Sequence, residues 1–155
     1  MRPETLTWLE KQKPRLVRWA EGFVSDSKLY EANAKTVNNP RGQREPHVKT
    51  NQIRNLLGAA QAGEPLAVLV NFLRYQRGRR KGWPHEPSGQ ALEELFNKEL
   101  SSLIDKRLGN LETSEAQAGA STDERYEVES YLAAQLLGFI VREYTYRCAC
   151  VGTRP

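Results

Sequence analysis

The stretch PLAVLVNFLRYQRG, Pro65 to Gly78, indicates the fold class more clearly than any other part of the chain. Val68 and Phe72 widen an apolar face whose i, i+3, i+4, i+7 spacing is set by Leu66, Leu69, Val70 and Leu73. Proline suits the start of a helix, and we expect Gly78 to end this one in the left-handed conformation. A helix this apolar is predicted to lie at the centre of a helical bundle.

Helical patterns also occupy most of the remaining sequence. The expected helices run over 4–24 with a break or restart at Pro14, from Ser25 or Asp26 to Ala34, from a Thr50 cap to Gly63, from a Ser88 cap to about Leu108, and from Thr122 or Asp123 onward. No alternating β-branched run and no Asn-Gly or Asp-Gly hairpin suggests strands. We therefore predict an all-α protein, a single domain over residues 1–155 folded as a compact bundle of about five or six helices.

Two segments lack apolar periodicity, a basic loop at 35–48 and a polar linker at 109–122. Charge is uneven along the chain: residues 1–85 hold 16 Lys/Arg against 7 Asp/Glu, and residues 86–155 hold 7 against 12. Such segregation favours a basic face that binds nucleic acid, or head-to-tail contact between copies, although chance clustering also produces it. No apolar run is long enough for a bilayer and no secretory signal is present, so we expect a cytoplasmic protein without membrane contact.

Residues with the potential for catalysis or metal binding are few. Cys148 and Cys150 form a CAC sequence whose spacing matches no common zinc site, and His47 and His85 lie far from it in Pro-flanked segments. Phosphate-binding loops and hydrolase motifs are missing, and the carboxylates, including Glu93, Glu94 and Glu99, are expected on solvated helix faces. We therefore expect no enzyme, no catalytic residue, no metal site and no cofactor.

The segment RYQRGRRKGW, Arg74 to Trp83, is the strongest candidate for a binding surface. Arginine binds phosphate through two parallel hydrogen bonds and also stacks on bases, so a cluster of this kind favours a nucleic-acid backbone. The alternative is a solubilising helix end. The Tyr75 ring is either a stacking platform or part of the core. The candidate cations in this segment are Arg74, Arg77, Arg79, Arg80 and Lys81.

Two motifs together carry a resemblance to a known family. HVKTNQIRNLL (47–57) and FLRYQRGRR (72–80) resemble the small-subunit family of type III CRISPR–Cas effector complexes, with III-A (Csm) the nearest type and III-D nearly as close. The resembling features are a Thr-x-Gln-Ile-Arg helix start at 50–54 and a Tyr-x-x-Gly-Arg helix end at 75–79. Leu56 and Leu57 occupy a stretch where the family often has an aromatic residue, and Asn71 to Arg74 stand where it often has Lys-Pro.

The resemblance implies a non-catalytic, helical subunit that serves antiviral defence. Its copies would stack head to tail beside other effector subunits and contact guide RNA and target RNA without reading their bases. The motif positions that carry over are Arg54, Arg77 and Arg79; Arg74, Arg80 and Lys81 are added from charge and helix position, and Arg41, Arg44 and Lys49 from the basic loop and the residue after it. A stand-alone helical nucleic-acid-binding protein and a helical adaptor for an acidic protein remain the alternatives.

Overall fold

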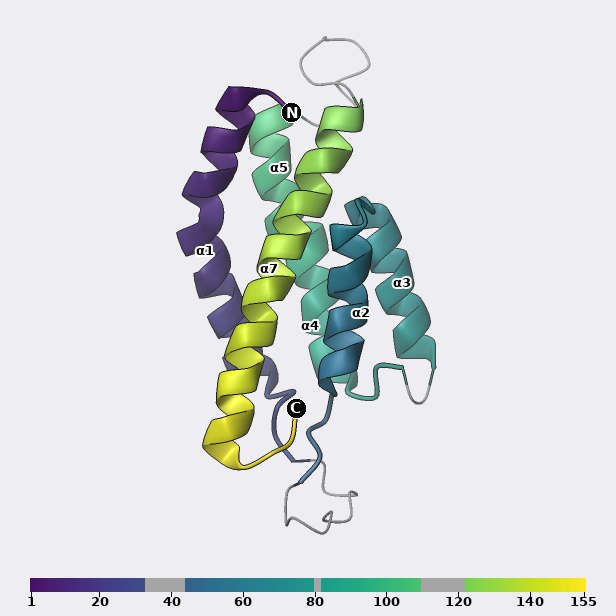
Figure 1. Cartoon of the computed structure of the whole chain (residues 1–155). Helices are drawn as coiled ribbons and strands as arrows, with labels where there is room; N and C mark the ends of the chain where they lie inside the picture. The colour runs from purple at the N-terminus through teal and green to yellow at the C-terminus, as the bar shows by residue number, and fades with distance from the viewer. Residues whose placement is uncertain (33–43, 80–81, 110–121) are drawn as a thin grey trace.

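The computed structural model describes residues 1–32, 44–79, 82–109 and 122–155, which form a bundle of helices (Figure 1). Within these ranges no strand forms, and the only β-type contacts are isolated bridges between Ala32 and Pro46 and between Arg44 and Thr153. The predicted all-α bundle is confirmed. Five helical rods make it up: α1 (Pro3–Ser27), α2 (Thr50–Gln61), α3 (Leu66–Gly78), the continuous run of α4 (Glu86–Glu94), η1 (Leu95–Leu100) and α5 (Ser101–Leu108), and α7 (Thr122–Val151).

The central helix is α7 rather than α3. It lies between α1 and α2 and packs most extensively against these two (Figure 1). Its buried apolar residues span most of its length: Val128, Leu132, Ala133, Leu136, Leu137, Ile140, Tyr144 and Cys148. By contrast, α3 lies at the edge beside α2 and α4, and Val68 on it is 43% exposed. The prediction that the 65–78 helix occupies the centre is therefore wrong, because only its Leu66–Leu73 stripe is covered.

The first helix is continuous, which corrects two predictions. Pro14 lies inside α1 with its ring exposed, so the chain neither breaks nor restarts there. Proline inside a helix costs about 3 kcal/mol, and the burial of Leu9 and Leu16 on either side against the core offsets this cost. The helix then ends at Ser27, followed by Lys28 in the left-handed conformation with φ 55°, so no helix begins at Ser25 or Asp26.

The other predicted helix boundaries are mostly confirmed. α2 begins at Thr50, but Lys49 is its N-cap, and the Lys49 N–H donates to Gln52 Oε1 at 2.6 Å. The α4–η1–α5 run ends at Leu108 as predicted but begins at Glu86, and η1 inserts a π-helical turn. α7 begins at Thr122. None of the helices within the described ranges is both long and apolar enough to cross a membrane.

A buried polar cluster closes the end of the bundle where α7 begins. Arg125 is only 7% exposed and donates to Glu129, Asp105 and the Gly109 carbonyl at 2.9, 2.6 and 2.8 Å. Glu129 also accepts a hydrogen bond from the backbone N–H of Leu66 at 3.0 Å. Arg125 and Glu129 therefore tie α7 to the end of α5 and the start of α3. Buried charges of this kind require such partners, since an unpaired buried ion is costly.

At the opposite end, the chain turns tightly after α3. The backbone N–H groups of Arg79 and Trp83 both donate to the Gln76 carbonyl, at 3.2 and 2.9 Å. Gly82 lies so close that a Cβ atom there would be 2.5 Å from that carbonyl oxygen. Gly78 does not adopt the left-handed conformation we expected; it is the last residue of α3, and Arg79 follows in an extended conformation. The close approach at Gly82, rather than a glycine cap, makes this turn possible.

Replacing Gly82 by alanine is expected to destabilise the protein by about 1–3 kcal/mol, because the added methyl group collides with the Gln76 carbonyl. The matched control is Gly78→Ala in the same segment, where a Cβ would meet nothing within 4 Å and the chain is helical. We expect that control to be neutral or stabilising by up to about 1 kcal/mol. The free energy of unfolding from urea titration measures both, and equal values for the two variants would contradict the structure.

Candidate nucleic-acid interface

Four segments meet at the end of the bundle opposite the Arg125 cluster. α2 begins there, α3 ends there, and the C-terminus returns to the same end (Figure 1). The residues before α2 join it through the bridge between Arg44 and Thr153, and the Arg154 N–H donates to the Arg44 carbonyl at 2.9 Å. We define the basic end by five of the described cations that lie there, which are Arg44, Lys49, Arg54, Arg79 and Arg154. Arg154 was not predicted, because nothing in the sequence signals that the C-terminus folds back.

The predicted site residues differ in how available they are. Arg44, Arg54 and Arg79 are exposed, and their guanidinium groups form no ion pair with any described residue. Lys49 is exposed and lies 3.3 Å from the carboxylate of Glu45. Three further predicted cations, Arg41, Arg80 and Lys81, lie outside the described residues.

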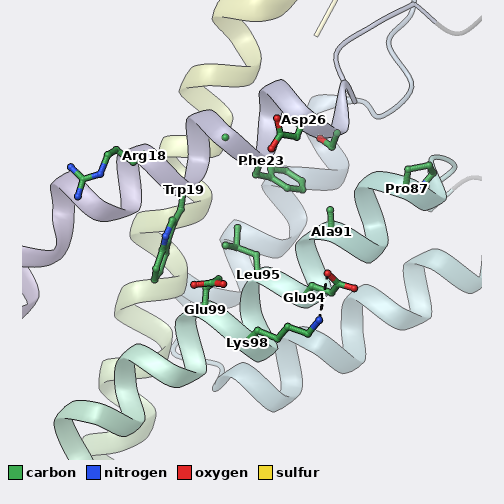
Figure 2. Close-up of a pocket in the computed structure, with 12 residues that line it drawn as sticks. Arg18, Trp19, Phe23, Asp26, Pro87, Ala91, Glu94, Leu95, Lys98 and Glu99 are labelled. Carbon is green, nitrogen blue, oxygen red and sulfur yellow. Dashed lines mark ion pairs between the residues drawn. The ribbon is translucent and has the colours of Figure 1, made fainter.

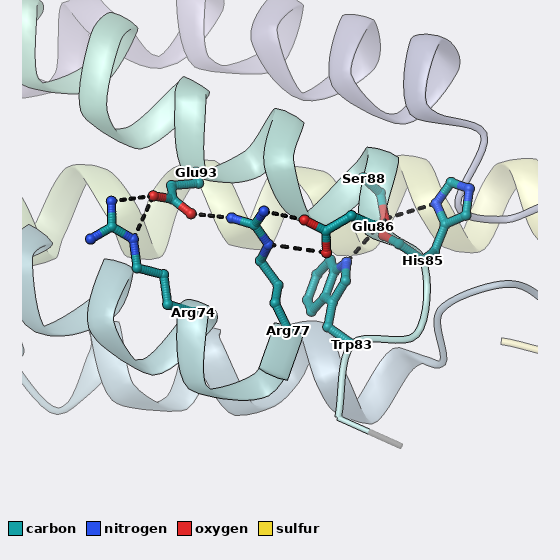
Figure 3. A network of polar contacts seen from close by, with 7 residues as sticks. All are labelled: Arg74, Arg77, Trp83, His85, Glu86, Ser88 and Glu93. Carbon is teal, nitrogen blue, oxygen red and sulfur yellow. Dashed lines mark hydrogen bonds and ion pairs between the residues drawn. The ribbon is translucent and has the colours of Figure 1, made fainter. Parts of the chain in front are cut away.

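Arg74 and Arg77 share a face, as their spacing predicts, but that face lies against α4 (Figure 3). Both bind Glu93, with the Arg74 Nε at 2.6 Å, and Arg77 also binds Glu86 through two of its nitrogens. We name this alternating row of four charges the α3–α4 seam. The prediction that Glu93 is a solvated outer residue is wrong, since its side chain is 13% exposed and bound to two arginines.

The seam reduces the availability of Arg77 most. Its side chain is 19% exposed and contacts two carboxylates, whereas that of Arg74 is 63% exposed and contacts one. The hydrogen bonds from Arg77 lower the pKa of the Glu86 carboxyl, so this carboxylate stays charged near neutral pH. A Cβ on Gly89 would lie 3.0 Å from the Arg77 side-chain carbons, so this glycine lets α4 approach. Arg77 therefore holds two helices together, and a phosphate would have to compete with Glu86 for it.

The two aromatic residues of RYQRGRRKGW have different environments. Trp83 is 2% exposed, and its indole N–H donates to the Ser88 hydroxyl at 3.0 Å. Ser88 in turn donates to the His85 carbonyl at 2.9 Å, so it organises the start of α4 without serving as the predicted cap. Tyr75 is 58% exposed, and the Arg79 guanidinium carbon lies 5.5 Å from the centre of its ring. Tyr75 is therefore not part of the core, which settles one of the two options for this ring.

A stacked pair of histidines joins the segment before α2 to the turn before α4. The rings of His47 and His85 lie 4.5 Å apart, with planes only 14° from parallel. His85 Nδ1 is 2.9 Å from the Ser88 hydroxyl. Burial, and to a smaller extent the charge of His47, lowers the pKa of His85. Burial thus favours neutral His85, and the stack connects the segment before α2, which carries the first motif, to the turn before α4.

A groove of about 540 Å³ separates the second half of α1 from α4 and η1 (Figure 2). Its apolar floor includes Trp19, Phe23 and Leu95, and its rim carries charges of both signs. Glu94 and Lys98 on this rim form an ion pair with atoms 3.7 Å apart. A rim of mixed charge does not favour a polyanion, and none of the predicted cations lines this groove. The basic end is therefore the better candidate for binding nucleic acid.

The cysteines give no indication of a metal or nucleophile. Cys148 is buried, and burial raises the pKa of its thiol, while Cys150 is exposed. In the described parts of the chain, no three His, Cys, Asp or Glu side chains gather closely enough to hold a metal ion.

Comparisons with protein-family models, with curated proteins and with solved structures found no match for this chain. Function is therefore inferred from the two motifs and from the geometry of the basic end.

The histidine stack predicts a loss of stability in mild acid. Because the pKa of His85 is lowered in the folded state, the unfolded chain binds more protons once the pH falls below its ordinary value of about 6.5. We expect full stability above that pH and a progressive loss below it, bounded for one proton by about 1.4 kcal/mol per pH unit. Urea unfolding at pH 7.5 and at 5.5, where ordinary carboxylates remain ionised, measures the difference.

The matched variant for this experiment is His85→Gln, which cannot gain a proton. Its stability should fall less between the two pH values than that of the unmodified protein. An equal fall in both proteins would show that His85 does not cause the effect.

Proposed function

We propose that this protein is a non-catalytic, RNA-binding structural subunit of a type III CRISPR effector complex, of the III-A or the III-D type. It contacts the backbones of guide RNA and target RNA in the cytoplasm, in antiviral defence. The single observation that carries the proposal is the position of Arg54 and Arg79. They come from the two halves of the paired motif, lie at the same end of the bundle, and are exposed without a carboxylate partner among the described residues.

Contacts between exposed arginines and the RNA backbone suit a structural scaffold better than a protein that recognises one base sequence. Contacts from arginine to phosphate oxygens fix the position of the protein on the backbone and carry no direct information about bases. A guide must be free to have any sequence, because base pairing does the reading in RNA-guided complexes. A few weak contacts per copy suffice when several copies bind one RNA, since linked sites strengthen one another.

The proposal includes head-to-tail contact between copies, with the basic end of one against the α7 start of the next. The acidic residues there are not equally available. Glu129 is buried beside Arg125, and Glu124 is bound by Arg2 and Thr5 at 3.1 and 2.9 Å, so neither is a free contact. Glu127 is 55% exposed and lies 3.3 Å from the terminal amino group of Met1. Of the three residues Glu124, Glu127 and Glu129, Glu127 is therefore the best placed to meet a second copy.

Single-stranded RNA binding across a salt series tests the RNA-binding proposal. Arg54→Ala and Arg79→Ala are each expected to weaken binding about 2- to 5-fold, as for an exposed ion pair worth up to about 1 kcal/mol. Each should also flatten the plot of log affinity against log salt by about 0.7, which is the slope for one single-strand phosphate. The matched control is Arg15→Ala, which removes an exposed charge from the middle of α1.

The same assay distinguishes the seam from the basic end. Glu86→Gln removes one of the two carboxylates bound to Arg77 and leaves Glu93. We expect RNA affinity to rise about 2- to 5-fold, because one negative charge is lost and a phosphate no longer competes with Glu86 for Arg77. Tight binding to one DNA duplex sequence, or equal losses in the Arg15→Ala control, would contradict the proposed function.

Charge reversal at Glu127 tests the head-to-tail contact. Glu127→Lys places a cation opposite the basic end, so self-association should weaken at low salt and change little at high salt. Sedimentation velocity over a concentration series measures the effect, with Glu21→Lys on the exposed face of α1 as a control of equal charge change. Equal behaviour of the two variants would exclude this contact.

A further inference from the structure

The position of Tyr75 on α3 explains why its side chain points away from the core. At about 100° per residue, the centre of the Leu66, Leu69, Val70 and Leu73 stripe lies about 170° from Tyr75 around the helix. The side chain is 58% exposed as a result. Single exposed apolar residues are common and need no function. The surroundings of the ring therefore have to supply the argument.

Among the described residues, one cation, Arg79, lies over this ring. The Arg79 guanidinium carbon lies 5.5 Å from the ring centre, a distance typical of a cation–π contact. Tyr75 is 58% exposed even though Arg79 packs beside it. Much of the tyrosine surface is therefore open to a second partner. Arg79 makes no ion pair with a described residue. One arginine thus combines a stacking contact with a charge that is still available to a phosphate.

The Tyr75–Arg79 pair is also separate from the α3–α4 seam. Arg77 lies about 160° from Tyr75 around the helix and faces Glu86 and Glu93 on α4. By this angle, the carboxylates that hold Arg77, which Figure 3 shows on α4, lie on the side of α3 away from Tyr75. A ligand that approaches Tyr75 meets an aromatic ring and a guanidinium group that pairs with no described carboxylate, rather than the acidic groups of the seam.

We propose that Tyr75 and Arg79 form a stacking site for one unpaired nucleobase of single-stranded RNA. The base lies against the open surface of the Tyr75 ring, and Arg79 binds the neighbouring phosphate. This inference rests on the proposed function and names the chemical group that its basic end receives. Aromatic rings bind bases of any sequence, because each base has a π face.

The chemistry of the pair favours an unpaired base over a duplex. Bases within a duplex already stack on each other and do not present their faces to a side chain. A phosphate can use only the hydroxyl group of tyrosine, whereas a base uses the face of the ring. An exposed tyrosine beside an arginine that pairs with no carboxylate in the described parts of the chain is thus most useful where both a base face and a phosphate are accessible.

Fluorescence anisotropy with a short labelled single-stranded RNA tests this site. Tyr75→Ala is expected to weaken binding roughly 5- to 100-fold, the range for loss of one base-stacking contact. Tyr75→Phe keeps the ring and should bind as the unmodified protein does. Tyr126→Ala is the matched control, because Tyr126 is 42% exposed on α7 at the opposite end of the bundle. It should leave the affinity unchanged.

A second RNA without bases separates stacking from charge. The unmodified protein should bind an abasic strand of equal length more weakly than the complete strand, and Tyr75→Ala should lower this residual affinity no further. The salt slope of Tyr75→Ala should equal that of the unmodified protein, whereas Arg79→Ala flattens it.

The outcomes distinguish the two proposals. If the protein binds RNA but Tyr75→Ala has no effect, or weakens abasic binding equally, the stacking site is wrong and the RNA-binding proposal stands. If the unmodified protein binds neither strand, both proposals are wrong. Thermal unfolding of Tyr75→Ala should match the unmodified protein, as expected for an exposed side chain, so a change in affinity reflects the contact itself.

Discussion

The burial of α7 between α1 and α2 is the constraint on which the other elements depend. Completely buried leucines each contribute about 1.5–3 kcal/mol, and several lie in succession along this helix. The last turns of α7 also hold the basic end in place. Tyr144 donates to the Val48 carbonyl just before α2, and Thr153, after α7, donates to the Tyr30 carbonyl at 2.8 Å. The position of Arg54 on α2 therefore follows from packing at the core.

The two ends of the folded bundle differ in which charged side chains remain available at the surface. Many carboxylates of the acidic half are used internally: Glu129 by Arg125, Glu124 by Arg2, and Glu86 by Arg77. Four arginines without an ion pair to a described residue, Arg44, Arg54, Arg79 and Arg154, lie where α2 begins and α3 ends, whereas Arg15 and Arg18 on α1 also lack such a pair. Net charge along a sequence thus predicts the sign of a surface only after these internal pairs are removed. Within a cation cluster, a residue without a carboxylate partner is therefore a better candidate for binding than one that holds two helices together, as Arg77 does.

Sequence patterns predicted the helical fold and most helix boundaries because apolar periodicity reports one buried face per helix. They failed where a residue's effect depends on its neighbours in space. Pro14 was expected to break α1, yet core packing on both sides holds the helix together. The most apolar stretch was expected at the centre, but the longer α7 occupies it because its apolar residues span more of the bundle. The return of Arg154 to Arg44 depends on a backbone bridge that no local pattern encodes.

The residues around the end of α3 show which parts of a site can be predicted from sequence. The orientation of Tyr75 was predictable, since its angle from the apolar stripe excludes the core while the chain is helical. Trp83 lies beyond the last helical residue, so no such angle applies, and its burial depends on the turn at Gly82. Predicting the ion pairs of the α3–α4 seam from the sequence requires one further step. Glu86 and Glu93 are seven residues apart and so share one face of α4, which matches the shared face of Arg74 and Arg77 once the two helices are taken as antiparallel. Arg79 lies past the end of α3, where α4 offers it no carboxylate among the described residues, and for that reason its charge is available to a ligand.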